Sequence, residues 1–279
     1  MQYRKPNFLI IGAMKAGTTT LYEDLRATPE FYLPPEKEPN DLAYWDGENE
    51  EVLTQYLLKF EGARSELWVG DASTAYAKLP RYEGIAERAR NGLGPDLRIV
   101  YMVRHPVDRA ISHYKHNVLR GVETRAPEEA MTPLSGYIAY GRPDYQLAPW
   151  RDRFRAENIL LLSFEDYVEQ RVETLNTLRA FFDLPRTSSN LAPIRNASAG
   201  KRIIPQGSAL RSFITSKFYL YRIKPLLPLG LRDRLKALVA RQSEVNVRLD
   251  RSLIDHIVTA SLSEADRLCL RSISARFEF

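Results

Sequence analysis

Four short apolar runs, nearly continuous rather than alternating, constrain the fold of this chain more than any other feature. They cover residues 7–12, 67–71, 98–103 and 159–164. Strands buried on both faces of a parallel sheet have this pattern. Helical patterns separate the runs, at residues 17–28, 50–60, 81–91, 106–120 and 165–182. The alternation predicts an α/β domain in which helices flank a central parallel sheet.

After residue 185 the strand signals fade, and the chain continues as loop and then helix. Residues 231–242 place Leu231, Leu235, Leu238 and Val239 on one helical stripe. We find no domain boundary, so we expect a single domain over residues 1–279 with a helical, basic C-terminal part at 205–279. Residues 121–149 are predicted to form an extended surface loop with a short helix at most.

The cysteine content and the apolar runs exclude several classes of protein. The only cysteine, Cys269, rules out a disulfide within the chain and a cysteine-rich metal site. We expect it to be a small buried side chain on a C-terminal helix. No run approaches the length of about 20 apolar residues that spans a bilayer. The first apolar run leads into a glycine-rich turn rather than a cleavage site, so we expect a cytoplasmic enzyme.

The net charge of +5 conceals an uneven distribution. Residues 195–251 contain thirteen Lys or Arg and three Asp or Glu, which gives 13 − 3 = +10 and leaves 5 − 10 = −5 for the rest. A basic segment on a mildly acidic body favours an anionic partner for that segment. A pair of solvated basic helices is the alternative interpretation.

The first apolar run ends at a glycine-rich loop that precedes a helical pattern. Gly12 and Gly17 have the separation found in the phosphate loop G-x-x-x-x-G-K-[ST], but Thr18 occupies the lysine position and Lys15 lies inside the loop. Backbone N–H groups and a helix N-terminus make such a loop an anion site. The hydroxyl groups of Thr18, Thr19 and Thr20 are further donors to phosphate oxygens.

The displaced lysine distinguishes between two kinds of phosphate ligand. In an ATP-binding loop the lysine precedes the Ser or Thr and reaches the β- and γ-phosphates. Lys15 would instead project over the loop toward a shorter, diphosphate-like group. An ATP-dependent kinase remains an alternative, supported by Asp71 at the end of a predicted strand, where a metal-binding carboxylate would stand.

A second anion site is predicted after the run at residues 98–103. Arg104 follows this strand, Pro106 suits the first turn of a helix, and Ser112 lies two turns further on. Ligands of open parallel sheets bind at the carboxyl ends of the strands. Arg104 should therefore lie beside the glycine-rich loop if the two strands are neighbours. A guanidinium and a hydroxyl together form a phosphate clamp.

The segments KAGTT (15–19) and RHPVDRAIS (104–112) resemble the two nucleotide-binding motifs of the sulfotransferases that use 3′-phosphoadenosine 5′-phosphosulfate (PAPS). The resemblance extends to residues 36–45, 164–167 and 196–203, and is closest to the heparan-sulfate-like branch and its bacterial relatives. It implies the sulfotransferase fold related to the P-loop kinases, PAPS as donor, and transfer of a sulfuryl group to an acceptor hydroxyl.

The resemblance also implies roles for individual residues. Lys15 would contact the oxygen that bridges sulfate and phosphate and stabilise the departing phosphate. The 5′-phosphate would be held by Ala16, Gly17, Thr18, Thr19 and Thr20. Arg104 and Ser112 would bind the 3′-phosphate. Lys201 and Arg202 match a basic loop that closes over the nucleotide.

The catalytic base implied by the resemblance is Glu38, in the K-E-P segment. An acceptor hydroxyl has a very high pKa, so its proton must leave during attack. Glu36 is a nearby competitor, and His113 and His116 are alternative bases that we expect to be structural. Asn40 begins a departure from the family, whose K-E-P segment often continues with His and aromatic residues.

The acceptor site is less defined by the sequence. We place Asp71 and Ser73 near the acceptor. Tyr145, in a tyrosine-rich segment with Tyr137 and Tyr140, would stack on a sugar ring or a lipid chain, with ordinary packing as the alternative. The acceptor is expected to be a hydroxyl of a glycan, glycolipid or small metabolite. We expect no metal and no nucleic acid, although a non-catalytic module that binds polyanions remains an alternative. The basic segment could contact a membrane surface, and the oligomeric state stays open.

Overall fold

The computed structural model describes residues 4–187 and 249–277. Its centre is a five-stranded parallel sheet with the order β2-β3-β1-β4-β5. The strands are β1 (Phe8–Gly12), β2 (Phe31–Tyr32), β3 (Trp68–Ala72), β4 (Arg98–Val103) and β5 (Ile159–Ser163). The four predicted strands are confirmed. The sequence pattern missed β2, whose two residues are too few to show a periodicity.

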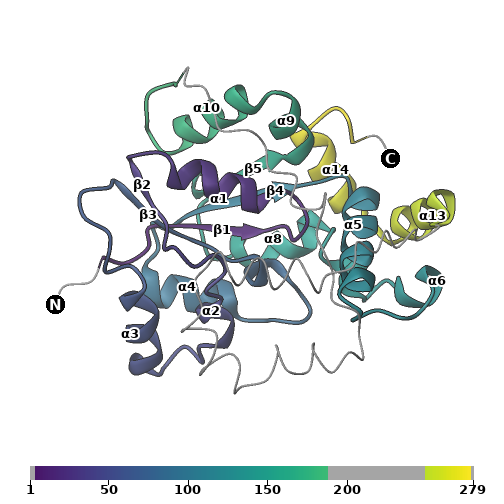
Figure 1. Ribbon diagram of the computed structural model, residues 1–279, viewed down its shortest axis with the longest axis horizontal. Coiled ribbons are helices and arrows are strands. Elements are labelled where there is room, and N and C mark those ends of the chain that lie inside the picture. The colour runs from purple at the N-terminus through teal and green to yellow at the C-terminus, as the bar shows by residue number, and fades with distance from the viewer. Residues whose placement is uncertain (1–3, 188–248, 278–279) are drawn as a thin grey trace, which may run out of the picture.

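Helices cover both faces of the sheet, as predicted. In Figure 1, α1 (Thr18–Arg26), α9 (Phe164–Glu169) and α10 (Arg171–Phe181) lie over one face. The other face is covered by α2 (Asp41–Tyr44), α3 (Glu50–Leu58) and α4 (Ile85–Leu93). The helix predicted at 165–182 is interrupted at Gln170, whose φ of −124° and ψ of 49° are not helical.

Several of the remaining helices lie beyond the carboxyl ends of the strands in Figure 1. α5 (Pro106–Leu119) follows β4, and the chain then forms α6 (Pro127–Ala130), α7 (Gly136–Ala139) and α8 (Pro143–Arg151). The described C-terminal part consists of α13 (Arg251–Ser261) and α14 (Glu264–Ile273), beside α5 and α8. Two short 3₁₀ helices, η1 (Thr74–Ala77) and η2 (Ala156–Asn158), complete the structure. The helix expected at residues 231–242 lies outside the described residues.

The expectation of a surface loop at residues 121–149 is wrong. This segment contains α6, α7 and most of α8, and its residues Tyr137, Tyr140 and Leu147 are buried. The polar residues and prolines of this segment are typical of a surface loop, so its sequence does not indicate that it is buried. The burial results from packing against α5 and α13. Cys269 is buried on α14, as expected.

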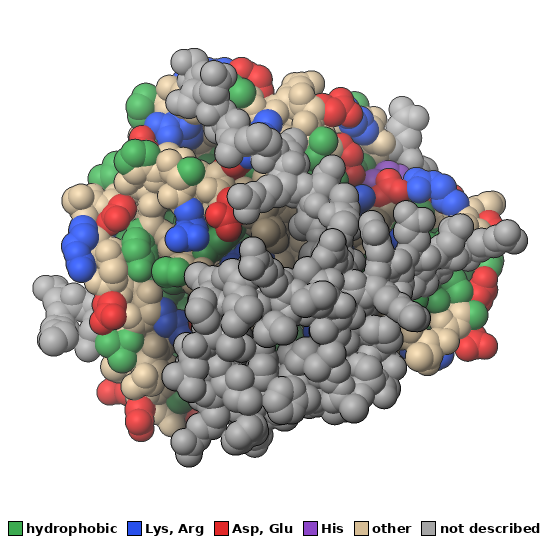
Figure 2. Space-filling view, viewed as in Figure 1, with side chains coloured by type: hydrophobic (Ala, Val, Ile, Leu, Met, Phe, Trp, Pro, Cys, Tyr) green, Lys and Arg blue, Asp and Glu red, His purple; other side chains and the backbone are tan. Residues whose placement is uncertain are grey.

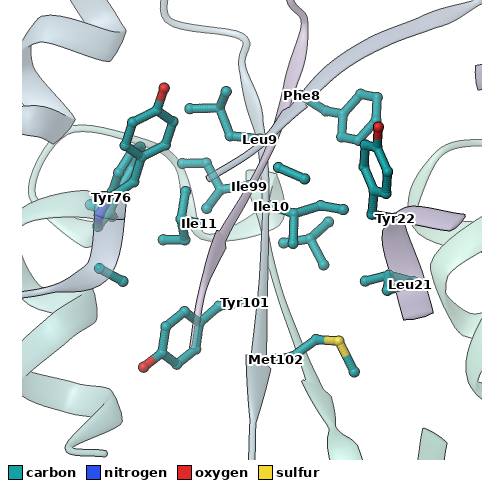
Figure 3. Packing of buried hydrophobic residues seen from close by; sticks show 14 of the residues in the cluster. Phe8, Leu9, Ile10, Ile11, Leu21, Tyr22, Tyr76, Ile99, Tyr101 and Met102 are labelled. Carbon is teal, nitrogen blue, oxygen red and sulfur yellow. The ribbon is translucent and has the colours of Figure 1, made fainter. Parts of the chain in front are cut away.

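The side chains of β1 point alternately to the two faces of the sheet, and both sides belong to the core. Figure 3 shows Phe8 and Ile10 directed to the side of α1, with Leu21 and Tyr22, whereas Leu9 and Ile11 point to the side of Tyr76. All four β1 side chains are fully buried. Acidic and basic side chains of the described residues are interspersed on the face shown in Figure 2. Among the described residues, no helix has the length and apolar character needed to cross a membrane.

Candidate active site at the carboxyl ends of the strands

The glycine-rich loop joins β1 to α1 through a left-handed residue at the helix N-cap. Gly17 has φ 83° and ψ 6°, and it makes no side-chain cap, so the first N–H groups of α1 remain available for an anion. A Cβ atom at this position would lie 2.6 Å from Cδ2 of Phe164. Glycine is therefore required here both by the backbone conformation and by the ring beneath it.

The other loop residues differ in exposure. Ala16 and Thr18 are buried, Lys15 and Thr20 are half-buried, and Thr19 is exposed. Lys15 also has a left-handed backbone, with φ 73°, which is uncommon for a residue other than glycine. Its carbonyl oxygen accepts a hydrogen bond from Arg104.

The two predicted anion sites are adjacent in the structure. β1 pairs directly with β4. Nη1 of Arg104, which follows β4, donates a hydrogen bond of 3.0 Å to the carbonyl oxygen of Lys15. The guanidinium carbon of Arg104 lies 4.7 Å from the ring centroid of Phe164, the same ring that underlies Gly17. The expectation that Arg104 lies beside the loop is confirmed, and Phe164 joins the site as a residue that sequence reasoning did not assign.

Arg104 is held in a partly dehydrated setting. Burial lowers its pKa, while Asp108 and Glu165 oppose this effect. Within the described residues, its Nε atom is buried and has no hydrogen-bond partner. Ser112 is half-buried on α5, eight residues after Arg104 and four after Asp108, so Asp108 and Ser112 share a helix face. Arg251 of α13 pairs with Asp108 at 2.6 Å, which adds another cation near this face.

Glu38 lies in a turn attached to the end of β3. Its backbone N–H donates to the carbonyl oxygen of Ala72 at 3.2 Å. Its Oε1 atom accepts hydrogen bonds from Nζ of Lys37 at 2.6 Å and from Oγ1 of Thr74 at 3.3 Å. Burial alone would raise the pKa of Glu38, but Lys37, Lys78 and Thr74 outweigh it and hold the pKa below its usual value. Glu38 is therefore ionised at neutral pH and able to accept a proton.

The order of the strands explains why these residues converge. β1 lies between β3 and β4, so the segments that follow these three strands meet at one edge of the sheet. Lys15 follows β1 and Arg104 follows β4, while the Glu38 turn, which follows β2, is hydrogen-bonded to the end of β3. Glu36, the competitor of Glu38, is exposed.

Asp71 and Ser73, which the sequence analysis placed near the acceptor, have buried side chains. Both side chains are 0% exposed. The Asp71 carboxylate accepts hydrogen bonds from the hydroxyls of Tyr56 at 2.9 Å, Ser73 at 2.6 Å and Tyr76 at 2.5 Å. Burial raises the pKa of Asp71 to about 6. Their contact with an acceptor stays a prediction, while the structure makes them part of the interior beneath the Glu38 turn.

Tyr145 and the histidines lie in packed surroundings. Tyr145 is half-buried on α8, with the guanidinium carbon of Arg142 5.1 Å from its ring centroid. His113 is buried, and its ring lies 4.7 Å from that of Tyr137 and 5.8 Å from that of Tyr140. Burial, with the charge of Arg109, lowers the pKa of His113 to about 3. His113 is thus structural, as expected.

Two further predictions concern other parts of the chain. Lys201 and Arg202, the residues of the expected closing loop, lie outside the described residues. In the described part of the chain, no cluster of three or more His, Cys, Asp or Glu side chains could hold a metal ion.

Comparison with known proteins identifies the family. The sulfotransferase domain model matches residues 5–200, so the chain belongs to this family, whose members use PAPS. It is 26% identical over 208 residues to the mouse heparan sulfate glucosamine 3-O-sulfotransferase 6, covering 71% of this chain and 58% of the relative. It is 30% identical over 113 residues to the mouse bifunctional heparan sulfate N-deacetylase/N-sulfotransferase 4, covering 40% of this chain. The chain spans 58% and 13% of the lengths of these two relatives.

Solved structures agree with the fold. The sulfotransferase from Alicyclobacillus acidocaldarius has 30% sequence identity and a TM-score of 0.58, and the match covers 68% of this chain and 87% of that one. Mouse sulfotransferase SULT7A1, solved in complex with PAP, has 16% identity and a TM-score of 0.51, with 97% of this chain and 90% of that one covered. The predicted sulfotransferase fold is thereby confirmed.

Proposed function

We propose that this chain is an enzyme that transfers the sulfuryl group of PAPS to the hydroxyl group of an acceptor. One observation carries the proposal: Arg104 donates to the backbone of Lys15, so the loop that suits a 5′-phosphate and the cation that suits a 3′-phosphate form one site. The nucleotide of PAPS carries phosphate at both positions, whereas ATP lacks the second. The match to the sulfotransferase domain supports the same donor.

The mechanism is an in-line displacement at sulfur. The acceptor oxygen forms a bond to sulfur as the bond between sulfur and the bridging phosphate oxygen breaks. Glu38 takes the acceptor proton, and Lys15 with the N-terminus of α1 stabilises the negative charge that develops on the departing phosphate. The loop from Ala16 to Thr20 holds the 5′-phosphate. Arg104 and Ser112 hold the 3′-phosphate, and Lys201 and Arg202 belong to the loop that closes over the nucleotide.

The kinase alternative loses its main support. It depended on Asp71 as a strand-end carboxylate that would hold a metal ion. The Asp71 side chain is instead enclosed by three hydroxyl groups and fully buried.

A sugar hydroxyl is the acceptor that we propose. Two relatives are named for heparan sulfate, and the cations of Lys37 and Lys78 beside Glu38 suit an acceptor that carries negative charge. The basic segment at 195–251 would attract a polyanionic glycan or an anionic membrane surface. We retain the cytoplasm as the proposed location.

Calorimetric titration with 3′-phosphoadenosine 5′-phosphate (PAP) against ADP, without added metal, tests the donor. We expect PAP to bind more tightly, and Arg104→Ala to reduce this preference roughly 10- to 100-fold, because a charge-assisted contact to the 3′-phosphate is lost. Arg155→Ala is the matched control, since Arg155 is exposed near the amino end of β5, whereas Arg104 follows the carboxyl end of the parallel strand β4. Equal binding of PAP and ADP, or binding of ADP only with Mg²⁺, would contradict the proposal.

A further inference from the structure

The turn that carries Glu38 adopts an unfavourable backbone conformation. Glu38 and Asn40 both have φ 61°, in the left-handed region that side chains other than glycine rarely occupy. Asparagine tolerates this region, but glutamate lacks the short polar side chain that bonds to its own backbone there. Such a conformation persists only where the surrounding structure over-determines it. The contacts that hold the turn therefore decide where the Glu38 carboxylate lies.

Three hydrogen bonds hold the turn in place. The N–H of Glu38 donates to the carbonyl oxygen of Ala72 at 3.2 Å, and the Asn40 side chain donates to the carbonyl oxygen of Glu38 at 2.6 Å. The third involves a side chain beneath the turn, because the N–H of Asn40 donates to Oγ of Ser73 at 3.1 Å.

Ser73 connects this turn to the strand that leads into the phosphate loop. Its backbone N–H donates to the carbonyl oxygen of Ile10 at 3.1 Å, two residues before β1 ends at Gly12. Its side chain accepts from Asn40. One residue thus fixes the distance between the Glu38 turn and the loop that contains Lys15.

Asp71 sets the direction of the Ser73 hydroxyl. The hydroxyl donates its only hydrogen to Oδ1 of Asp71 at 2.6 Å, which leaves its oxygen lone pairs for the N–H of Asn40. Tyr56 and Tyr76 both donate to the other carboxylate oxygen, so Asp71 is itself fixed in orientation. All four side chains are buried, where hydrogen bonds are stronger and an unpaired group is costly.

We propose that Asp71 and Ser73 are positioning residues that hold Glu38 in register with Lys15. The inference rests on the proposed function, in which Glu38 takes the acceptor proton. Asp71 and Ser73 exchange no proton during turnover. They fix the left-handed turn so that the Glu38 carboxylate faces the acceptor while Lys15 faces the departing phosphate.

Ser73→Ala and Tyr56→Phe form a matched pair of variants. Each removes one hydroxyl that donates to Asp71 inside the core, but only Ser73 also holds the turn. Both should lower the melting temperature by a similar few degrees and leave the affinity for PAP unchanged. Hydrogen exchange of the peptide that contains residues 38–42 should become faster in Ser73→Ala and stay as in the wild type in Tyr56→Phe.

Turnover is followed as PAP release from PAPS with desulfated heparan sulfate as acceptor. We expect Ser73→Ala to lower kcat about 10- to 100-fold without raising KM for the acceptor, because a small misplacement of a catalytic group costs rate rather than binding. Tyr56→Phe should retain wild-type kcat, because Tyr76 still donates to the same carboxylate oxygen and keeps Asp71 in place. Equal exchange rates in the two variants would overturn the inference whatever the turnover shows.

A Glu38→Gln variant separates this inference from the proposed function. If Glu38→Gln retains full turnover, the assignment of the base fails. If Glu38→Gln is inactive while Ser73→Ala turns over as the wild type does, the positioning role fails and the base assignment stands.

Discussion

At the scale of single residues, the phosphate loop is shaped by side chains that lie outside it. The Phe164 ring comes from the start of α9, closes the space beside Gly17 and supports the Arg104 guanidinium. Arg104 in turn binds the carbonyl oxygen of Lys15. The loop, α9 and the end of β4 therefore form one unit, and a change at Gly17 should propagate to both phosphate sites.

We predict that Gly17→Ala weakens PAP binding at least tenfold. Its φ of 83° is unfavourable for alanine, and the new Cβ would lie 2.6 Å from Phe164, so the loop must shift. Gly84→Ala is a close control, because Gly84 is also a left-handed N-cap, with φ 72°, and its Cβ would meet only the flexible end of Arg88. Calorimetry with PAP compares the two variants. Equal affinities of the two variants for PAP would contradict the prediction, because Gly84 lies at the start of α4 and outside the glycine-rich loop.

At the scale of helices and strands, sequence alone could predict the elements whose surroundings are uniform. β1, β3 and β4 are largely buried from both sides and β5 is at least half-buried, so their apolar runs identify them. The prediction failed for residues 121–149, where long-range packing on α5 and α13 buries polar and aromatic residues. The candidate site divides in the same way. Lys15 and Arg104 follow from local motifs, whereas the contacts of Phe164 with Gly17 and of Ser73 with Asn40 join segments far apart in the sequence.

The contact between α5 and α7 predicts a specific weakness toward acid. His113 is enclosed by Tyr137 and Tyr140, and burial lowers its pKa to about 3 from an ordinary value of 6.5. Below pH 6.5 His113 binds a proton in the unfolded chain but not in the folded chain. The free energy of unfolding therefore decreases as the pH falls below this value. Between pH 7 and pH 5 this loss amounts to about 2 kcal/mol.

The His113→Phe variant lacks this titration and should escape the loss. Urea unfolding of the wild type and the variant at pH 7 and pH 5 measures this loss of stability. We expect the free energy of unfolding to fall by about 2 kcal/mol more in the wild type than in the variant. Any cost of the substitution to packing, including the lost contact to Asn117, is common to both pH values and cancels. An equal fall in the two proteins would show that His113 can be protonated within the fold.

At the scale of the whole molecule, the site draws on segments from most of the described chain. The glycine-rich loop follows β1, and the Glu38 turn follows β2. Arg104 follows β4, and Phe164 follows β5. The Glu38 turn is also hydrogen-bonded to Ala72 at the end of β3. These segments meet only when the sheet is complete. A nucleotide that binds here binds the folded state alone, and it must stabilise the entire domain.

We therefore predict that PAP raises the melting temperature without any metal ion. At a PAP concentration of 100 times Kd the added stability is about 2.7 kcal/mol, which corresponds to a shift of about 5–10 °C for a chain of this size. EDTA should leave the shift unchanged, because Lys15, Arg104 and the N-terminus of α1 supply the positive charge. ADP at the same concentration should give a smaller shift, since it lacks the 3′-phosphate. If EDTA abolishes the shift, a metal ion must bind together with the nucleotide. Lys15, Arg104 and the N-terminus of α1 would then not be sufficient to neutralise the phosphates.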